Sequence, residues 1–216
     1  MRTTFRDRTE AGQLLAEQLR RYEKRFDTTV LALPRGGVPV GYEIAVALGL
    51  PLDIFVVRKL GVPGQPELAM GAIASGGVRV LNEDVLRAMP YAAATVAEIT
   101  AEETREVERR ERDYRQDRPA PELEERTVIL VDDGLATGAS MLAGIGALRR
   151  QDPARIVVAV PVCPPETLGE IERAADETVA LFAPAWFRGV GQFYGDFAQV
   201  SDETVRDLLA RAARRE

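Results

Sequence analysis

Two adjacent carboxylates, Asp132 and Asp133, follow an apolar run that ends at Val131. Shortly after them come five small or hydroxyl residues: Ala136, Thr137, Gly138, Ala139 and Ser140. If these five residues open a helix, their main-chain N–H groups and the positive end of the helix dipole form a site for an anion. The hydroxyls add donors, and the glycine lets the backbone approach a phosphate closely. The carboxylates are acceptors suited to a pair of ribose hydroxyls, so the spacing favours a site for a phosphorylated sugar.

Simpler explanations account for less of this pattern. A helix cap needs one acidic or hydroxyl residue, and not an adjacent acidic pair behind an apolar strand. The segment lacks the Gly-Lys-Ser/Thr ending of a Walker loop and the Gly-x-Gly-x-x-Gly of dinucleotide-binding folds. Another doubly wound nucleotide or methyl-donor binder could use Asp132, Asp133 and Gly134, but the absence of an early Gly-x-Gly loop counts against that class.

A second group of donors lies about 100 residues earlier, where Arg35, Gly36 and Gly37 follow the apolar run Thr29–Leu33. The glycines expose main-chain N–H groups, and the guanidinium of Arg35 offers a fork of donors that matches phosphate oxygens. Taken alone, these residues could also form a plain strand-to-helix turn. Together with the segment after Val131, they predict a second anion-binding loop.

Arg58 and Lys59 form a third cationic group, after the apolar run Leu52–Val57. Of the 28 lysines and arginines, only Lys24 and Lys59 are lysines. A lysine at position 59 therefore indicates a need for a compact ammonium group, although Lys24, which we expect on a helix surface, weakens that argument. The segment Gly61–Gly71 is rich in glycine and proline, and we expect it to be a flexible loop that closes over a ligand.

The bulk composition sets limits on function. A net charge of -6 argues against a general nucleic-acid binder, although a few well-placed cations can still hold a small anion. The first ten residues are polar and no apolar run reaches about 20 residues, so we expect no signal peptide, no membrane span and a cytoplasmic location.

Cys163 is the single cysteine, and we expect it to be a buried structural residue. Histidine is absent, so any proton transfer must use a carboxylate, a tyrosine, a lysine, the substrate or water.

The elements that must position these residues follow from the apolar pattern. Five short runs predict buried strands, and helical patterns separate them: Thr29–Leu33, Leu52–Val57, Thr127–Val131, Ile156–Val162 and Thr178–Phe182. The expected fold is α/β and doubly wound, with a five-stranded, mostly parallel sheet flanked by helices. In such a sheet ligands bind at the carboxyl ends of the strands, near the switch point, and each of the three groups follows a strand.

The rest of the chain is expected to surround this core. We predict one domain over residues 1–216, with a core of about 28–183 and a small hood from residues 1–27 and 184–216. Ala72–Leu81 predicts a β-hairpin around Ser75-Gly76-Gly77, which together with the flexible loop belongs to the hood. Further helices are predicted over about residues 8–25 and 91–115, the second with many Glu/Arg pairs four residues apart.

The segment from Val131 to Ser140 resembles the signature by which type I phosphoribosyltransferases bind 5-phosphoribosyl-1-pyrophosphate (PRPP). Within it, the residues Leu135–Gly138 are most similar to the matching segment of adenine-type members. The Arg-Lys-Leu-Gly segment and the aromatic-rich tail are similar to those of bacterial predicted phosphoribosyltransferases. The resemblance covers about Leu31–Phe182. It implies a five-stranded parallel core under a variable hood, and transfer of ribose 5-phosphate from PRPP to a nitrogenous base or similar acceptor, with Mg²⁺ on the released pyrophosphate.

The resemblance also implies a role for each group of residues. Asp132 and Asp133 would hold the ribose hydroxyls and contact Mg²⁺ through water or PRPP, and residues 136–140 would hold the 5-phosphate. The pyrophosphate contacts would come from five residues: Arg35, Gly36, Gly37, Arg58 and Lys59. Lys59 and the two aspartates would be the catalytic residues. A cis peptide bond is expected between Pro34 and Arg35.

The acceptor is left open by the sequence. By the same resemblance its pocket would fall at Trp186–Tyr194, where Trp186 or Phe187 could stack on a ring, unless these aromatics belong to the core. Members that act on hypoxanthine and guanine carry an acidic residue where this chain has Ala136. PRPP and a nitrogenous acceptor are the expected partners, with a homodimer as a further possibility. A non-catalytic module of the same fold that binds PRPP or a nucleotide is the alternative function, and the intact aspartate pair and Arg35 loop favour the enzyme.

Overall fold

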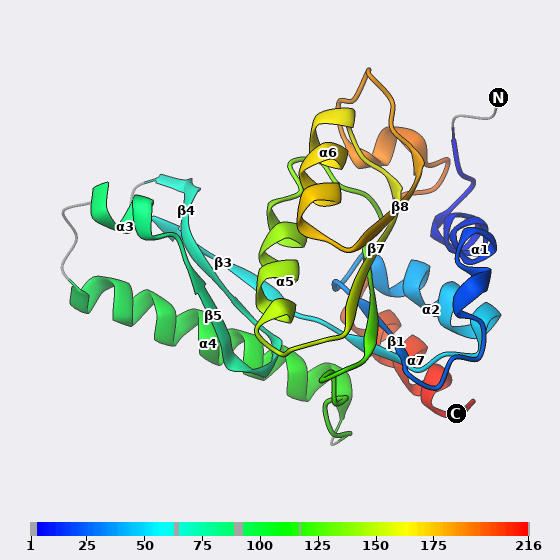
Figure 1. The fold of residues 1–216 in the computed structure, drawn as a ribbon, viewed down its shortest axis with the longest axis horizontal. Coiled ribbons are helices and arrows are strands. Elements are labelled where there is room, and N and C mark those ends of the chain that lie inside the picture. The colour runs from blue at the N-terminus through cyan, green and yellow to red at the C-terminus, as the bar shows by residue number, and fades with distance from the viewer. Residues whose placement is uncertain (1–3, 63–64, 89–92, 117, 216) are drawn as a thin grey trace.

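The computed structural model describes residues 4–62, 65–88, 93–116 and 118–215. Its centre is a parallel sheet of five strands in the order β2-β1-β6-β7-β8 (Figure 1). The strands are β1 (Thr28–Ala32), β2 (Leu52–Ile54), β6 (Thr127–Val131), β7 (Arg155–Val162) and β8 (Glu177–Phe182). The predicted α/β class and the five parallel core strands are confirmed.

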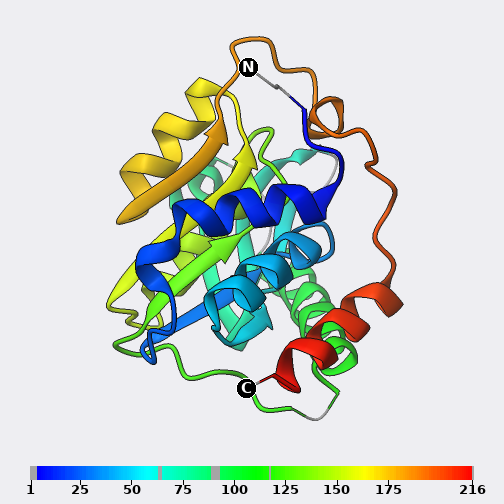
Figure 2. The same ribbon diagram turned by 90° about the vertical axis from the view of Figure 1, so that its right-hand side faces the viewer.

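Helices cover both faces of this sheet (Figures 1 and 2). One face carries α1 (Arg8–Gln18), α2 (Gly37–Leu48) and α7 (Asp202–Ala213), and the other carries α5 (Ala139–Arg149) and α6 (Pro165–Ala174). Short 3₁₀ turns lie at Arg20–Tyr22 and Val190–Phe193. No described helix combines the length and the apolar character needed to cross a membrane.

The sheet separates two hydrophobic cores. Val30 and Ile129 pack into the core under α1 and α2, whereas Leu31 and Leu130 pack into the core under α5. This alternation arises because successive residues of a strand point to opposite faces. Every residue of β1 and β6 is buried, which explains why both strands are apolar after their first threonines, from Val30 and from Val128.

A second, antiparallel sheet extends to one side of the core (Figure 1). It consists of β3 (Val57–Val62), β4 (Gln65–Ala74) and β5 (Val78–Leu81), with α3 (Glu83–Ala88) at one end and the long α4 (Ala93–Arg115) beside it. The predicted hairpin is confirmed: β4 and β5 pair around a 3₁₀ turn at Ser75–Gly77. The predicted start of the long helix, at residues 91 and 92, lies outside the described residues.

The prediction of a loop over Gly61–Gly71 is wrong for most of that segment, because β3 and β4 pair through it. The pairing of the two strands shifts its register on either side of Gly61. Gly71 fits because β5 comes close: a Cβ there would lie 2.4 Å from the carbonyl oxygen of Val80. Residues 63 and 64 lie outside the described residues. Local glycine and proline content thus indicated a loop where long-range pairing makes a sheet.

Other element boundaries match the predictions only in part. The run Leu52–Val57 is not one strand, because β2 ends at Ile54 and Val57 already starts β3 in the other sheet. The N-terminal helix ends at Gln18 rather than near residue 25. Gly49 ends α2 in the left-handed region with a φ of 63°, and α7 begins where the Ser201 side chain accepts a hydrogen bond from the main-chain N–H of Thr204 at 3.0 Å.

The winding of the chain fixes where a ligand can enter. From β1 the chain passes through α2 to β2 at one edge, whereas from β6 it passes through α5, β7 and α6 to β8 at the other. The direction of winding therefore reverses between β1 and β6, which pair in parallel over five residues. The carboxyl ends of these two strands form the switch point of the sheet, where Arg35 and Asp132 follow in the chain.

Candidate substrate-binding site

The loop after β6 turns directly into α5. Gly138 caps this helix with a φ of 69°, and a Cβ there would lie 2.7 Å from Cγ2 of Thr167. Both the backbone conformation and the space therefore require glycine at this position. Its carbonyl accepts a hydrogen bond from the N–H of Leu142 at 2.9 Å, which marks the first turn. Residues 136–140 thus stand at a helix N-terminus, as the sequence predicted, and anion binding there stays a prediction.

The loop Arg35-Gly36-Gly37 lies directly against the aspartate pair. A Cβ on Gly36 would lie 2.1 Å from Oδ2 of Asp133, and a Cβ on Gly37 would lie 2.7 Å from the carbonyl oxygen of Val131. No side chain fits at either position, so the main chain of this loop reaches the end of β6. The structure therefore joins two motifs that are about 100 residues apart in the sequence into one site.

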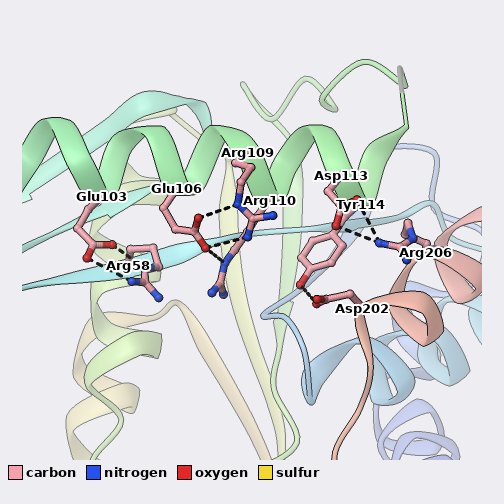
Figure 3. A network of polar contacts seen from close by, with 9 residues as sticks. All are labelled: Arg58, Glu103, Glu106, Arg109, Arg110, Asp113, Tyr114, Asp202 and Arg206. Atoms are coloured by element: carbon pink, nitrogen blue, oxygen red, sulfur yellow. Dashed lines mark hydrogen bonds and ion pairs between the residues drawn. The ribbon is translucent and has the colours of Figure 1, made fainter.

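Arg35 lies between this site and the C-terminal helix. The peptide bond between Pro34 and Arg35 is cis, as the resemblance implied. Nη1 of Arg35 lies 3.8 Å from Oδ1 of Asp202, the first residue of α7. That carboxylate oxygen also accepts a hydrogen bond from the Tyr114 hydroxyl of α4 at 2.5 Å (Figure 3). Burial, followed by the bond to Asp202, raises the pKa of Tyr114 to about 12, so the phenol stays a donor at neutral pH.

Arg8, at the start of α1, is part of the site and was not singled out from the sequence. Its Nε donates to Oδ2 of Asp133 at 2.8 Å, and its Nη1 donates to the carbonyl oxygen of Ala198 at 2.8 Å. The guanidinium carbon lies 4.0 Å from the ring centroid of Phe197, a cation–π arrangement. No local signal could have identified Arg8, because its carboxylate partner is 125 positions away in the chain.

Burial dominates the electrostatics of the aspartate pair. It raises the pKa of Asp132 well above its ordinary value, and the neighbouring charge of Asp133 raises it further. Burial also raises the pKa of Asp133, while the hydrogen bond and the charge of Arg8 oppose that rise. The Tyr194 hydroxyl donates to the carbonyl oxygen of Asp133 at 2.6 Å, and burial raises the pKa of this tyrosine too. In such a poorly solvated place, a ligand that brings donors or a cation would be held strongly.

A cavity of about 350 Å³ opens beside this cluster. Its lining includes Arg8, Arg35, Gly36, Asp133 and Phe197. Guanidinium and main-chain N–H groups suit phosphate oxygens, and the carboxylate suits sugar hydroxyls. Donors and acceptors of the types that suit a phosphorylated sugar therefore lie together beyond the carboxyl ends of β1 and β6.

The two cations of β3 contact different parts of the molecule. Lys59 lines a second cavity, of about 430 Å³, together with Ala139 and Ser140 at the start of α5. Arg58 instead donates to Glu103 of α4 at 2.6 Å (Figure 3). Neighbouring residues of a strand point to opposite sides, which accounts for the difference. The structure thus brings Lys59 to the predicted phosphate loop but not Arg58, whose contact with pyrophosphate stays a prediction.

Trp186 and Phe187 are not among the residues that line these two cavities. Trp186 is 81% exposed. Phe187 stacks on Phe193, with ring centroids 5.5 Å apart, at the edge of an aromatic cluster that also contains Phe5 and Tyr194. Phe187 therefore serves as packing here, and a stacking role toward an acceptor stays a prediction for both residues.

The aspartate pair fits Mg²⁺ in part. Carboxylates are the ligand type that Mg²⁺ prefers, and Asp132 and Asp133 supply two. Among the described residues, no three His, Cys, Asp or Glu side chains come together as a metal site. Mg²⁺ at this place would need most of its ligands from water and from a bound phosphate, which is usual where it accompanies phosphorylated substrates.

Comparison with known proteins gives the class to which this fold and site correspond. The family model of the phosphoribosyl transferase domain matches residues 8–197, which include the aspartate pair, the Arg35 loop, Lys59 and Arg8. The chain therefore belongs to the phosphoribosyl transferase domain family.

Particular relatives are close in sequence and in structure. Two Mycobacterium tuberculosis proteins, from strains CDC 1551 and H37Rv and each named "Putative phosphoribosyl transferase", are 45% identical over 210 residues. These matches cover 97% of this chain and 47% of each relative, so the chain spans about half the length of the curated relatives it matches. The crystal structure of TT1426 from Thermus thermophilus matches with a TM-score of 0.85 at 44% identity, over 96% of this chain and 98% of that one.

Proposed function

We propose that the chain is a phosphoribosyltransferase that moves ribose 5-phosphate from PRPP to a nitrogenous acceptor and releases pyrophosphate. The observation that carries the proposal is the contact between the Gly36 loop and Asp133, where a Cβ would fall 2.1 Å from the carboxylate. In this proposal, main-chain donors for the pyrophosphate lie beside acceptors for the ribose hydroxyls. Pyrophosphate and the ribose are the two parts of PRPP that the reaction separates.

Each group then has a role in binding PRPP. The N–H groups and hydroxyls of residues 136–140 bind the 5-phosphate, because they stand at the N-terminus of α5. Asp132 and Asp133 accept hydrogen bonds from the ribose hydroxyls. The loop that contains Arg35, and Lys59 next to the start of α5, bind the pyrophosphate. Arg58 would join them only by leaving Glu103.

Catalysis in this proposal rests on positioning and on charge neutralisation. The acceptor nitrogen forms a bond to C1 of the ribose while the bond from C1 to the pyrophosphate oxygen breaks, and the electron pair leaves with pyrophosphate. Arg35 and Lys59 stabilise that developing negative charge. Bound Mg²⁺ would neutralise further charge on the leaving group, held by Asp132 and Asp133 through water or PRPP. With no histidine in the chain, the acceptor proton leaves to a carboxylate, a tyrosine, a lysine, the substrate or water.

The remaining assignments belong to the same proposal. The chain acts as one domain, with residues 1–27 and 184–216 as a hood over the active site. Trp186 or Phe187 contacts the acceptor once it is bound, and PRPP and the acceptor are the partners. The acceptor itself and any homodimer are for experiment to define.

Pyrophosphate release tests the proposal. The protein is incubated with PRPP and Mg²⁺ against a panel of nitrogenous bases, and pyrophosphate and the nucleotide product are quantified. We expect at least one acceptor to support release, and the variant Asp132→Asn/Asp133→Asn to lose it. If PRPP binds but no acceptor supports release, the chain is a binding module of the same fold instead. If PRPP neither binds nor reacts, the proposal is wrong.

A further inference from the structure

Arg8 forms an ion pair with the aspartate pair. Among the described residues, Arg8 is the only side chain that forms an ion pair with either carboxylate, through Oδ2 of Asp133 at 2.8 Å. The side chains of Arg8 and Asp133 are 12% and 14% exposed, so the pair is largely shielded from water. The carboxyl of Asp132 is the other side-chain hydrogen-bond partner of Asp133. Arg8 holds Oδ2 of Asp133 and so sets the direction of the whole carboxylate.

Arg8 is itself held firmly by the segment before α7. Its Nη1 donates to the carbonyl oxygen of Ala198, and its guanidinium lies over the ring of Phe197 and 5.9 Å from the ring centroid of Tyr194. Tyr194 also donates to the carbonyl oxygen of Asp133. These contacts fix the plane of the guanidinium, so the bond to Asp133 has a defined direction. A guanidinium held on several sides loses less entropy per bond than a free side chain.

We propose that Arg8 is a positioning residue for ribose recognition: it holds Oδ2 of Asp133 so that Oδ1 meets a ribose hydroxyl. The inference rests on the proposed function of this site. A direct role in phosphate binding is the first alternative, because Arg8 lines the same cavity as Arg35. The second alternative is a purely structural role, in which Arg8 only ties α1 to the segment before α7.

The two parts of PRPP, titrated separately, distinguish these roles. Ribose 5-phosphate and pyrophosphate are titrated by calorimetry without Mg²⁺, so that only direct contacts count, and PRPP is titrated with Mg²⁺. For Arg8→Gln we expect the affinities for ribose 5-phosphate and PRPP to fall about tenfold or more, the loss that removal of a charge-assisted contact produces. Pyrophosphate affinity should stay as in the wild type. Arg8→Lys, which keeps the charge, should recover part of the loss.

Arg21 provides a matched control. It also pairs with a carboxylate, that of Glu177, and lies over an aromatic ring, that of Tyr22, with 5.2 Å to the centroid. Glu177 starts β8, so this pair lies at the amino end of the sheet, opposite the candidate site. Arg21→Gln should leave all three affinities unchanged, and thermal denaturation of each variant separates stability from binding.

Each outcome decides the inference. Wild-type affinity for ribose 5-phosphate in a folded Arg8→Gln protein would make Arg8 merely structural. Loss of pyrophosphate affinity with ribose 5-phosphate affinity kept would make it a phosphate contact, and would equally overturn the inference. If Arg8→Gln does not fold, Arg8→Lys decides by the same two criteria. A wild-type protein that binds none of the three ligands would overturn the proposed function itself, a result distinct from failure of the Arg8 variants alone.

Discussion

Asp133 is contacted from three distant parts of the chain. Arg8 approaches its carboxylate from α1, Gly36 approaches it from the loop after β1, and the Tyr194 hydroxyl reaches its carbonyl oxygen. The free space around this side chain is therefore set by residues that share no local sequence. Substitutions at these contacts should change ligand affinity through the position of the carboxylate.

Gly36→Ala tests the contact most sharply. The φ of Gly36 is -63°, which alanine adopts freely, and the three atoms nearest to the added methyl group all belong to the Asp133 carboxylate. We expect PRPP affinity to fall about tenfold or more by calorimetry, because the carboxylate must move. In the control Gly146→Ala, the nearest atoms to the new Cβ lie 3.9 Å away, and the helix should gain up to about 1 kcal/mol with unchanged affinity. Unchanged affinity in Gly36→Ala would show that this approach has no role in binding.

Lys59→Arg separates geometry from charge at the second cavity. Lys59 lines a cavity that the small residues at the start of α5 also line, and a planar guanidinium needs more room and a different set of bonds than an ammonium. We expect turnover with a competent acceptor to fall strongly, while the free energy of unfolding stays within about 0.5 kcal/mol. Lys24→Arg, at an exposed position, should change neither quantity. Equal turnover in the two variants would refute the role of Lys59.

At the scale of single residues, the sequence predicted the site residues that are neighbours in the chain. Residues 132–140 are consecutive, so their types and spacing predicted both the aspartate pair and the helix N-terminus. Arg8 and Tyr194 were missed because they meet Asp133 across 125 and 61 positions. A polar N-terminal arginine and a tyrosine in an aromatic tail look ordinary until the fold brings them to the switch point.

Among the elements, α4 connects the antiparallel sheet to the core. It holds Arg58 of β3 through Glu103 and meets α7 through Tyr114–Asp202 and Asp113–Arg206 (Figure 3). These contacts run along one helix from the second sheet to the residue that pairs with Arg35. The position of the candidate pyrophosphate arginines therefore depends on how α4 packs.

Removal of the buried anchor of α4 should destabilise the protein. Arg115 donates to Asp53 of β2 at 2.7 Å, with side chains 9% and 11% exposed. Arg115→Leu leaves the Asp53 carboxylate buried without its partner, which costs about 3–5 kcal/mol. We expect the loss in urea denaturation, and a change within about 0.5 kcal/mol for Arg109→Leu, whose ion pair is exposed. Equal stability of the two variants would show that the buried pair does not anchor the helix.

The sequence predicted strands best where both faces of the strand are buried. Strands β1 and β6 are covered on both faces and are apolar after their first threonines, so their place in the chain could be predicted from the sequence. The second sheet was only half predicted. Its β4–β5 hairpin has a local turn signal, whereas β3 changes register at Gly61 and depends on pairing that local composition does not encode.

At the scale of the whole molecule, a segment near the start of the chain meets the segment that precedes α7 at the site. Phe5 pairs with the segment of Tyr194 through main-chain hydrogen bonds, including Phe5 N–H to the Phe193 carbonyl at 2.7 Å, and α1 lies beside this segment (Figure 2). The residues around Asp133 thus come from near the start, from the middle and from near the end of the chain. Global folding is therefore required to assemble the site.

Cys163 reports on that global fold. Its side chain is buried, and burial raises the pKa of the thiol to about 11, so it is neutral and shielded at pH 8. We expect no alkylation by iodoacetamide in the native protein and rapid alkylation in urea, followed by mass spectrometry. Rapid labelling of the native protein would contradict both the burial and the structural role predicted for this cysteine.

Calorimetric titration of PRPP with Mg²⁺ is the most direct test of the central claim, that the ends of β1 and β6 bind PRPP. The wild type should bind, and Asp132→Asn/Asp133→Asn should remain folded but bind at least about 100-fold more weakly, because each lost charge-assisted bond costs about 1.5–3 kcal/mol. Equal affinity of the wild type and the double variant, or no binding by a folded wild type, would contradict it.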